Sequence, residues 1–220
     1  KIAAEQLPAV FHVSARTVST QALNIFGDHS DVMACRQTGF AMLCEGNVQE
    51  VMDLSPVAHL AALSGKVPFI NFFDGFRTSH EIQKIAVWDY EDLKDMCDMD
   101  AVAEFRRHAL NPEHPHMRGS HENGDIFFQH REACNKYYAE LPAVVEKYMD
   151  MVNAKLGTDY KLFNYYGHPE ADRVIVAMGS ICDVAEEVID YLNAHGEKVG
   201  LVKVRLYRPF APEKLLEAFP

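Results

Sequence analysis

The sequence predicts an α/β protein in which two parallel-sheet units follow one another along the chain. The first observation is a continuous apolar run at residues 66–73, typical of a strand covered by helices on both faces. The second is the helical pattern from residue 47 that precedes this run, and the third is a strand, helix and strand pattern at residues 173–206. We expect the first unit to span residues 1–165 and the second residues 166–220.

The first unit begins with two short strand candidates. One is the apolar run at residues 9–13, and the other is the segment at residues 36–43. Between them lies the turn-forming sequence Gly27-Asp28-His29-Ser30. The following helix should start at Asn47, with Glu50 at the capping-box position. Pro56 should bend or restart that helix.

The middle of the chain departs from this regular alternation. Residues 78–124 lack clean periodicity and include the turn-rich sequence Asn111-Pro112-Glu113-His114-Pro115-His116, which indicates a long insert or connection. Helix-favouring composition returns at residues 132–156, where we expect Pro142 to interrupt an inter-domain helix. Gly157 should end it.

The second unit should be a βαβ element of about 30 residues. A strand at residues 173–178 is followed by a tight turn at Gly179 and by Ser180, a good N-cap residue. After the helix, Gly196 supplies a left-handed C-terminal position and residues 198–206 form the next strand. Helical spacing predicts one apolar face made of Ile181, Val184, Ala185, Val188 and Leu192.

Composition excludes several classes of protein. The chain has 220 residues with 21 basic and 32 acidic side chains, and its net charge of −11 opposes binding to nucleic acid or anionic lipid. No apolar run approaches the roughly 20 residues that cross a bilayer. We therefore expect a soluble protein with no nucleic-acid or membrane partner, and we expect both ends of the chain to be cut ends.

The five cysteines are widely spaced and contain no C-x-x-C pair. This spacing argues against disulfides, zinc and iron–sulfur ligation within the segment. Cys182, just inside a helix, is the one thiol whose pKa we expect to be lowered.

Other catalytic patterns find little support. The histidines of the middle segment do not have the spacing of a metal site, so we predict no metal ligands. The Gly179-Ser180 turn is a weak anion-site signal, and no G-x-S-x-G nucleophile elbow occurs.

Arg16 is the most informative polar residue of the first unit. It follows an apolar strand, at the carboxyl edge where open α/β sheets place their ligands. A guanidinium there could bind a carboxylate through two parallel hydrogen bonds. From the pattern alone, a surface arginine or an internal ion pair is the commoner alternative. The strand-end segment 74–81 suits a site or a domain contact equally well.

Several strand-end segments resemble one family. The matching segments are Ala15-Arg16, Ile25-Phe26-Gly27-Asp28-His29-Ser30-Asp31, Arg36-Gln37-Thr38-Gly39-Phe40, Phe72-Phe73-Asp74-Gly75-Phe76-Arg77-Thr78-Ser79-His80-Glu81 and Lys203-Val204-Arg205-Leu206-Tyr207-Arg208-Pro209-Phe210. They resemble pyruvate:ferredoxin (or flavodoxin) oxidoreductase, and the resemblance covers essentially the whole chain.

The resemblance implies that residues 1–165 are the later part of a thiamine-diphosphate pyrimidine-binding domain with a long connecting segment. Residues 166–220 would begin a transketolase C-terminal-like domain. It also implies that Arg16 contacts the carboxylate of pyruvate. Gly27, Asp28 and His29 become a candidate active-site loop. Candidate domain contacts are Arg77, Thr78, His80 and Arg208.

In the full-length enzyme the resemblance implies oxidative decarboxylation of pyruvate to acetyl-CoA and CO2, with ferredoxin or flavodoxin accepting the electrons. The implied cofactors are thiamine pyrophosphate with Mg²⁺, 4Fe–4S iron–sulfur clusters and coenzyme A, none of them fully bound by this segment. The activating glutamate is expected upstream of Lys1.

The remaining partners would be the other domains and a second copy in a homodimer. The expected location is the cytoplasm, with an anaerobic organelle such as a hydrogenosome as the alternative. A non-catalytic docking segment, or the same chemistry on another 2-oxoacid, stays open.

Overall fold

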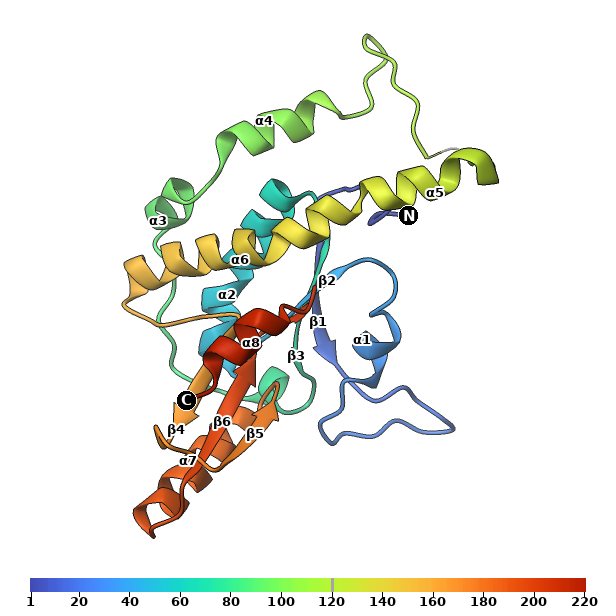
Figure 1. The fold of residues 1–220 in the computed structure, drawn as a ribbon. Coiled ribbons are helices and arrows are strands. Elements are labelled where there is room, and N and C mark those ends of the chain that lie inside the picture. The colour runs from blue at the N-terminus through green and yellow to red at the C-terminus, as the bar shows by residue number, and fades with distance from the viewer. Residues whose placement is uncertain (120) are drawn as a thin grey trace.

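The computed structural model describes residues 1–119 and 121–220 and contains two sheets (Figure 1). The first has the order β1-β3-β2-β7. Its parallel strands are β1 (Val10–Ala15), β3 (Phe69–Asp74) and β2 (Ala41–Cys44), and β7 (Leu206–Arg208) adds to β2 in the antiparallel sense. The expected parallel strands are confirmed, although residues 35–39 form a turn, so the second strand is shorter than predicted.

Two helices connect these strands, α1 (Ser30–Ala34) and α2 (Val48–Gly65). The side chain of Asn47 accepts the Glu50 N–H at 2.9 Å, as the capping pattern predicts. Pro56 was expected to bend or restart this helix, and the restart does not occur, because α2 continues through it. Proline removes the N–H that would bond the carbonyl four residues earlier. Here the Trp88 indole donates to that carbonyl, of Met52, at 3.0 Å.

The middle segment contains a 3-10 turn and four helices. These are η1 (Thr78–His80), α3 (Tyr90–Asp95), α4 (Met99–Arg107), α5 (Gly124–Ala133) and α6 (Asn135–Leu156). Figure 1 shows α6 lying across α2. The expected interruption at Pro142 is also wrong. The flanking Leu141 and Val145 are fully buried, and each such side chain contributes about 1.5–3 kcal/mol, which offsets the roughly 3 kcal/mol cost of an interior proline.

The second sheet has the order β4-β6-β5. Its strands are β4 (Phe163–Gly167), β5 (Arg173–Ala177) and β6 (Val199–Val204), followed after β7 by α8 (Pro212–Ala218). The strands β5 and β6 are parallel and α7 (Ile181–Ala194) joins them, which confirms the βαβ element. The antiparallel strand β4 was not predicted.

Only part of the predicted apolar face of α7 packs against the sheet, including Ala185. Ile181 is 55% exposed and Val188 50% exposed, whereas Cys182 and Ile189 are buried against Leu201 of β6. A three-stranded sheet is narrow, so it covers only the central stripe of the helix. Ser180 is the N-cap residue of α7, as predicted, but its side chain makes no capping hydrogen bond.

The two units share one hydrophobic core. Leu54 of α2 and Tyr148 of α6 belong to the same buried cluster as Leu162, Val204 and Leu206. The chain therefore returns from the second sheet to the first through β7. Among the residues that the structure describes, no helix has both the length and the apolar character needed to span a bilayer.

Candidate functional site

Arg16 lies directly after β1, at the carboxyl edge of the parallel strands. Its backbone N–H donates to the Asp31 carboxylate at 2.9 Å, and its carbonyl accepts the Asp31 N–H at 3.3 Å. The side chain is exposed, and its guanidinium carbon lies 4.5 Å from the centroid of the Phe76 ring. A cation–π contact of this kind restrains an arginine without neutralising its charge.

The turn after β3 supports the stem of Arg16. The Gly75 N–H donates to the Ala15 carbonyl at 2.7 Å, and a Cβ on Gly75 would lie 2.6 Å from both that oxygen and Arg16 Cγ. Only glycine allows this approach. Phe76 has the left-handed φ of +62°, held by its N–H bond to Ser79 Oγ at 2.9 Å. Such a strained residue is typical of functional sites.

Asp74, the last residue of β3, connects the predicted loop to the second unit. Its Oδ1 lies 2.6 Å from His29 Nε2, and its Oδ2 accepts the Ser180 N–H, also at 2.6 Å. The residue is only 5% exposed. Burial opposes ionisation, but the hydrogen bonds from His29 and Ser180 outweigh it and lower the pKa of Asp74. Asp74 is therefore a carboxylate shared between two segments.

Gly179 permits this contact. Its φ is +86°, and a Cβ there would lie 2.6 Å from Asp74 Oδ2 and 2.9 Å from His29 Cε1. A cleft of about 410 Å³ opens beside the contact. It brings together the three predicted loop residues with side chains from both units, namely Gly27, Asp28, His29, Asp74, Arg77, Met178, Ser180, Ile181 and Val184.

Asp28 is partly buried and also lines the cleft. The Ser30 hydroxyl and N–H both hydrogen-bond its carboxylate and lower its pKa. The loop is therefore ordered by its own turn chemistry, while His29 reaches toward Asp74.

Three of the four candidate domain-contact residues, Arg77, Thr78 and His80, lie together at the turn η1, and Arg208 lies elsewhere. Arg77 is exposed and lies 3.6 Å from Glu81, whereas the buried Thr78 donates its hydroxyl to the Gly46 carbonyl at 3.4 Å. The His80 ring stacks on Phe76. Arg208 lies on β7, opposite Met42 of β2. Only Arg77 lines the cleft.

No sequence pattern predicted that Glu45 and Glu50 would both be buried. The Glu50 carboxylate lies 2.6 Å from Arg205 Nη2, and its other oxygen accepts the Gly46 N–H at 2.8 Å. Glu45 is fully buried, and among the described residues its oxygens have no hydrogen-bond partner. Burial, with Glu50 nearby, raises the pKa of Glu45 well above its usual range. The only local sequence signal for Glu45 is that an acidic residue directly follows the buried strand β2.

The predicted direction of the Cys182 pKa shift is wrong. Burial raises the pKa of its thiol to about 12, where the helix-terminus argument predicts a lowered value. Desolvation disfavours the thiolate more than the helix dipole favours it.

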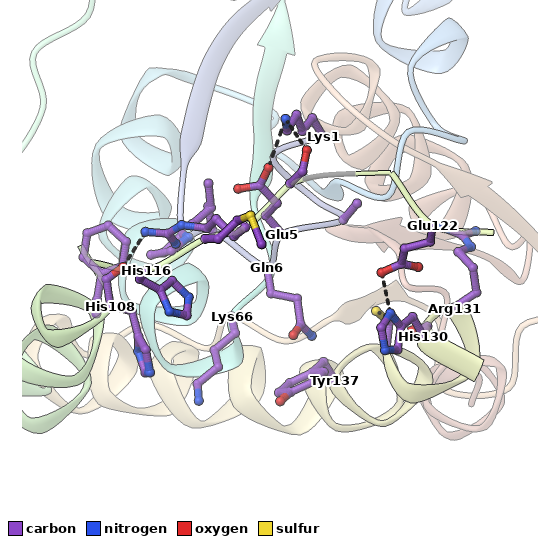
Figure 2. A pocket seen from close by; sticks show the side chains of 18 of the residues that line it. Lys1, Glu5, Gln6, Lys66, His108, His116, Glu122, His130, Arg131 and Tyr137 are labelled. Atoms are coloured by element: carbon purple, nitrogen blue, oxygen red, sulfur yellow. Dashed lines mark hydrogen bonds and ion pairs between the residues drawn. The ribbon is translucent and has the colours of Figure 1, made fainter. Parts of the chain in front are cut away.

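A larger pocket of about 1150 Å³ lies away from this edge, between the N-terminal segment and the helices α4 to α6. Figure 2 shows Lys66, His108 and His116 on one side of it and Glu122, His130 and Arg131 on the other. Some of its polar side chains contact one another, as Lys66 does Glu104 at 2.7 Å and His130 does Glu122. Within residues 1–119 and 121–220, no three metal-ligating side chains come together.

Arg16 is therefore the side chain best placed for chemistry with a ligand. An exposed guanidinium on a supported stem can bind a carboxylate through two hydrogen bonds.

Comparison with known proteins identifies two family matches. Residues 1–150 match the family described as pyruvate flavodoxin/ferredoxin oxidoreductase, thiamine diphosphate-binding. Residues 171–220 match pyruvate:ferredoxin oxidoreductase core domain II.

Individual relatives agree with these matches. The chain is 61% identical over its whole length to a pyruvate-flavodoxin oxidoreductase of Enterobacter agglomerans, of which it covers 19%. It is 60% identical over its whole length to a pyruvate:ferredoxin oxidoreductase of Moorella thermoacetica, again covering 19%. The chain thus spans about a fifth of the length of these relatives.

A solved structure shares the fold. It is a 2-oxoglutarate:ferredoxin oxidoreductase from Magnetococcus marinus with 2-oxoglutarate, coenzyme A and succinyl-CoA bound. The TM-score is 0.63 at 19% identity, over 99% of this chain and 40% of the other.

Proposed function

We propose, from the premise that this chain belongs to the pyruvate flavodoxin/ferredoxin oxidoreductase family, that it forms the substrate-side portion of a pyruvate-oxidising enzyme. The reaction would convert pyruvate and coenzyme A to acetyl-CoA and CO2. Ferredoxin or flavodoxin would accept the electrons.

The placement of Arg16 carries this proposal. Its guanidinium is exposed at the carboxyl edge of the sheet, and its backbone is held by Asp31. Bound there, the carboxylate of a 2-oxoacid would be oriented by two parallel hydrogen bonds. Arg16 would act through orientation and not as a proton donor, since guanidinium keeps its protons at physiological pH.

Thiamine diphosphate would supply the carbon nucleophile and the electron sink for decarboxylation. The residues of this chain would hold and orient the substrate beside it. We propose that Mg²⁺, the diphosphate group and the iron–sulfur clusters are held by other parts of the full-length protein.

The expectations about the active-site loop, the domain division, the oligomeric state and the cellular location are also proposals. The cleft beside Gly27, Asp28 and His29 would form one wall of the active site. The division into residues 1–165 and 166–220 remains a proposal, and the strand β4, which pairs with β6, lies at that division. A homodimer and a cytoplasmic location, or alternatively an anaerobic organelle, complete the proposal.

Replacement of Arg16 in the full-length enzyme tests the proposal. Hydrogen bonds to a charged group contribute about 1.5–3 kcal/mol, so Arg16→Ala should raise the pyruvate KM by about tenfold to a hundredfold or slightly more. The KM for coenzyme A should stay unchanged. Arg36→Ala, at another exposed arginine of the same unit, is the control. An unchanged pyruvate KM in Arg16→Ala would contradict the proposed contact.

A further inference from the structure

We propose that Asp74 is a positioning residue that couples the second unit to Arg16, so that docking of α7 sets the affinity for the 2-oxoacid. This inference rests on the proposed function of Arg16. It concerns residues that do not themselves touch the substrate.

Two backbone segments hold Arg16. On one side, Asp31 exchanges hydrogen bonds with its backbone N–H and carbonyl. On the other, Gly75 lies against its stem and Phe76 lies under its guanidinium. The position of the guanidinium therefore depends on the distance between the N-terminal end of α1, which contains Asp31, and the turn that contains Gly75.

Asp74 connects these two segments. Its own backbone leads into the turn at Gly75, and its Oδ1 lies 2.6 Å from Nε2 of His29, the N-cap residue of α1. The His29 ring also packs edge-on against Phe72 of β3, with ring centroids 5.3 Å apart. Since Asp74 is 5% exposed, water cannot readily replace His29 as its partner.

The second oxygen of Asp74 belongs to the other unit. It accepts the Ser180 N–H at 2.6 Å, at the start of the 14-residue helix α7. A second contact, from Asn47 Nδ2 to the Asp183 carboxylate at 3.1 Å, fixes the same end of α7. One carboxylate thus joins the end of β3, the His29 turn and α7. Displacing α7 would therefore alter the support of Arg16.

Gly179→Ala tests the coupling from the far side, without changing any residue that contacts Arg16. Its Cβ would lie 2.6 Å from Asp74 Oδ2, at a φ of +86°. Gly196→Ala is the matched control. Gly196 has a similar φ of +91° at the other end of the same helix, and a Cβ there would meet nothing within 4 Å.

The assay is steady-state kinetics of the full-length enzyme, with pyruvate and coenzyme A varied in turn. Displacing a substrate-positioning group by about 1 Å can reduce catalytic efficiency by up to two orders of magnitude. We therefore expect Gly179→Ala to raise the pyruvate KM by about tenfold or more. The coenzyme A KM should not change, and Gly196→Ala should resemble the unmodified enzyme. Asp74→Asn should reproduce the effect and serves as a second variant if Gly179→Ala folds poorly.

The double variant Arg16→Ala/Gly179→Ala distinguishes a loss of Arg16 positioning from a general loss of folding. In that background Gly179→Ala should have no further effect on the pyruvate KM, because the group that it misplaces is gone. Additive effects, or equal pyruvate KM values in Gly179→Ala and Gly196→Ala, would overturn the coupling. If Arg16→Ala itself left the pyruvate KM unchanged, the proposed function of Arg16 would fall first, so the two failures are distinguishable.

Discussion

Replacing Arg205 with methionine should loosen the contact between the two sheets. The Arg205 side chain is 5% exposed, its Nη2 lies 2.6 Å from Glu50 Oε1, and it also donates to Asn164. Methionine keeps much of the volume but removes the cation. The Glu50 carboxylate would then remain buried close to Glu45, and removing one partner of a buried pair costs about 3–5 kcal/mol.

Hydrogen exchange in the full-length protein measures this cost. The Arg205 N–H donates to the Leu162 carbonyl at 3.0 Å, and the Arg205 carbonyl accepts the Cys44 N–H at 2.9 Å, so both amides report opening between the sheets. Because about 1.36 kcal/mol of opening free energy corresponds to a tenfold change in exchange rate, exchange should accelerate by about two to nearly four orders of magnitude.

The control is Arg173→Met, which removes another ion-paired arginine whose side chain is 66% exposed. Surface pairs contribute little, so exchange at Arg205 and Cys44 should stay close to that of the unmodified protein. If Arg205→Met accelerated exchange by less than about tenfold, or no more than Arg173→Met, the assigned role of the buried pair would be refuted.

Three further predictions follow from individual contacts. Burial raises the folded-state pKa of Glu45 above its unfolded value of about 4.3, so stability should fall as pH rises above that value and through the folded pKa. Glu45→Gln should remove this loss, measured as the pH dependence of Tm. Cys182 and Cys44 should resist alkylation in the native protein and react after denaturation, as followed by mass spectrometry; fast native labelling of either would contradict their burial. Trp88→Phe should destabilise the middle of α2 by about 1–3 kcal/mol, because the Met52 carbonyl loses its donor, and unchanged amide exchange there would show that another group replaces the indole.

The location of the candidate site follows from the direction of the strands. The strands β1 and β3 are parallel, so Arg16 and Asp74 emerge at the same edge. That edge is also where α7 begins. A substrate contact and a contact between the units therefore arise from adjacent positions of one sheet.

Local patterns predicted several of the elements, although not the strand β4 or the helices α3 and α4. Alternating apolar runs and helical spacing predicted the strands β1 and β3 and the helix α2, and the Asn47 cap was identified because its partner is only three residues away. The position of Arg16 after β1 was equally local. Each of these features depends on residues close together in the sequence.

Only the tertiary structure decided how these elements are supported. The indole that compensates for Pro56 comes from Trp88, whose donor bond to Met52 spans 36 residues. The contact between Asp74 and Ser180 spans 106 residues, and that between Glu50 and Arg205 spans 155. No periodicity encodes partners at such separations. They form because packing places them together out of contact with water, where an unpaired charge or donor is costly. For the same reason the pKa of Cys182 could be assigned only after its burial in the folded chain was known.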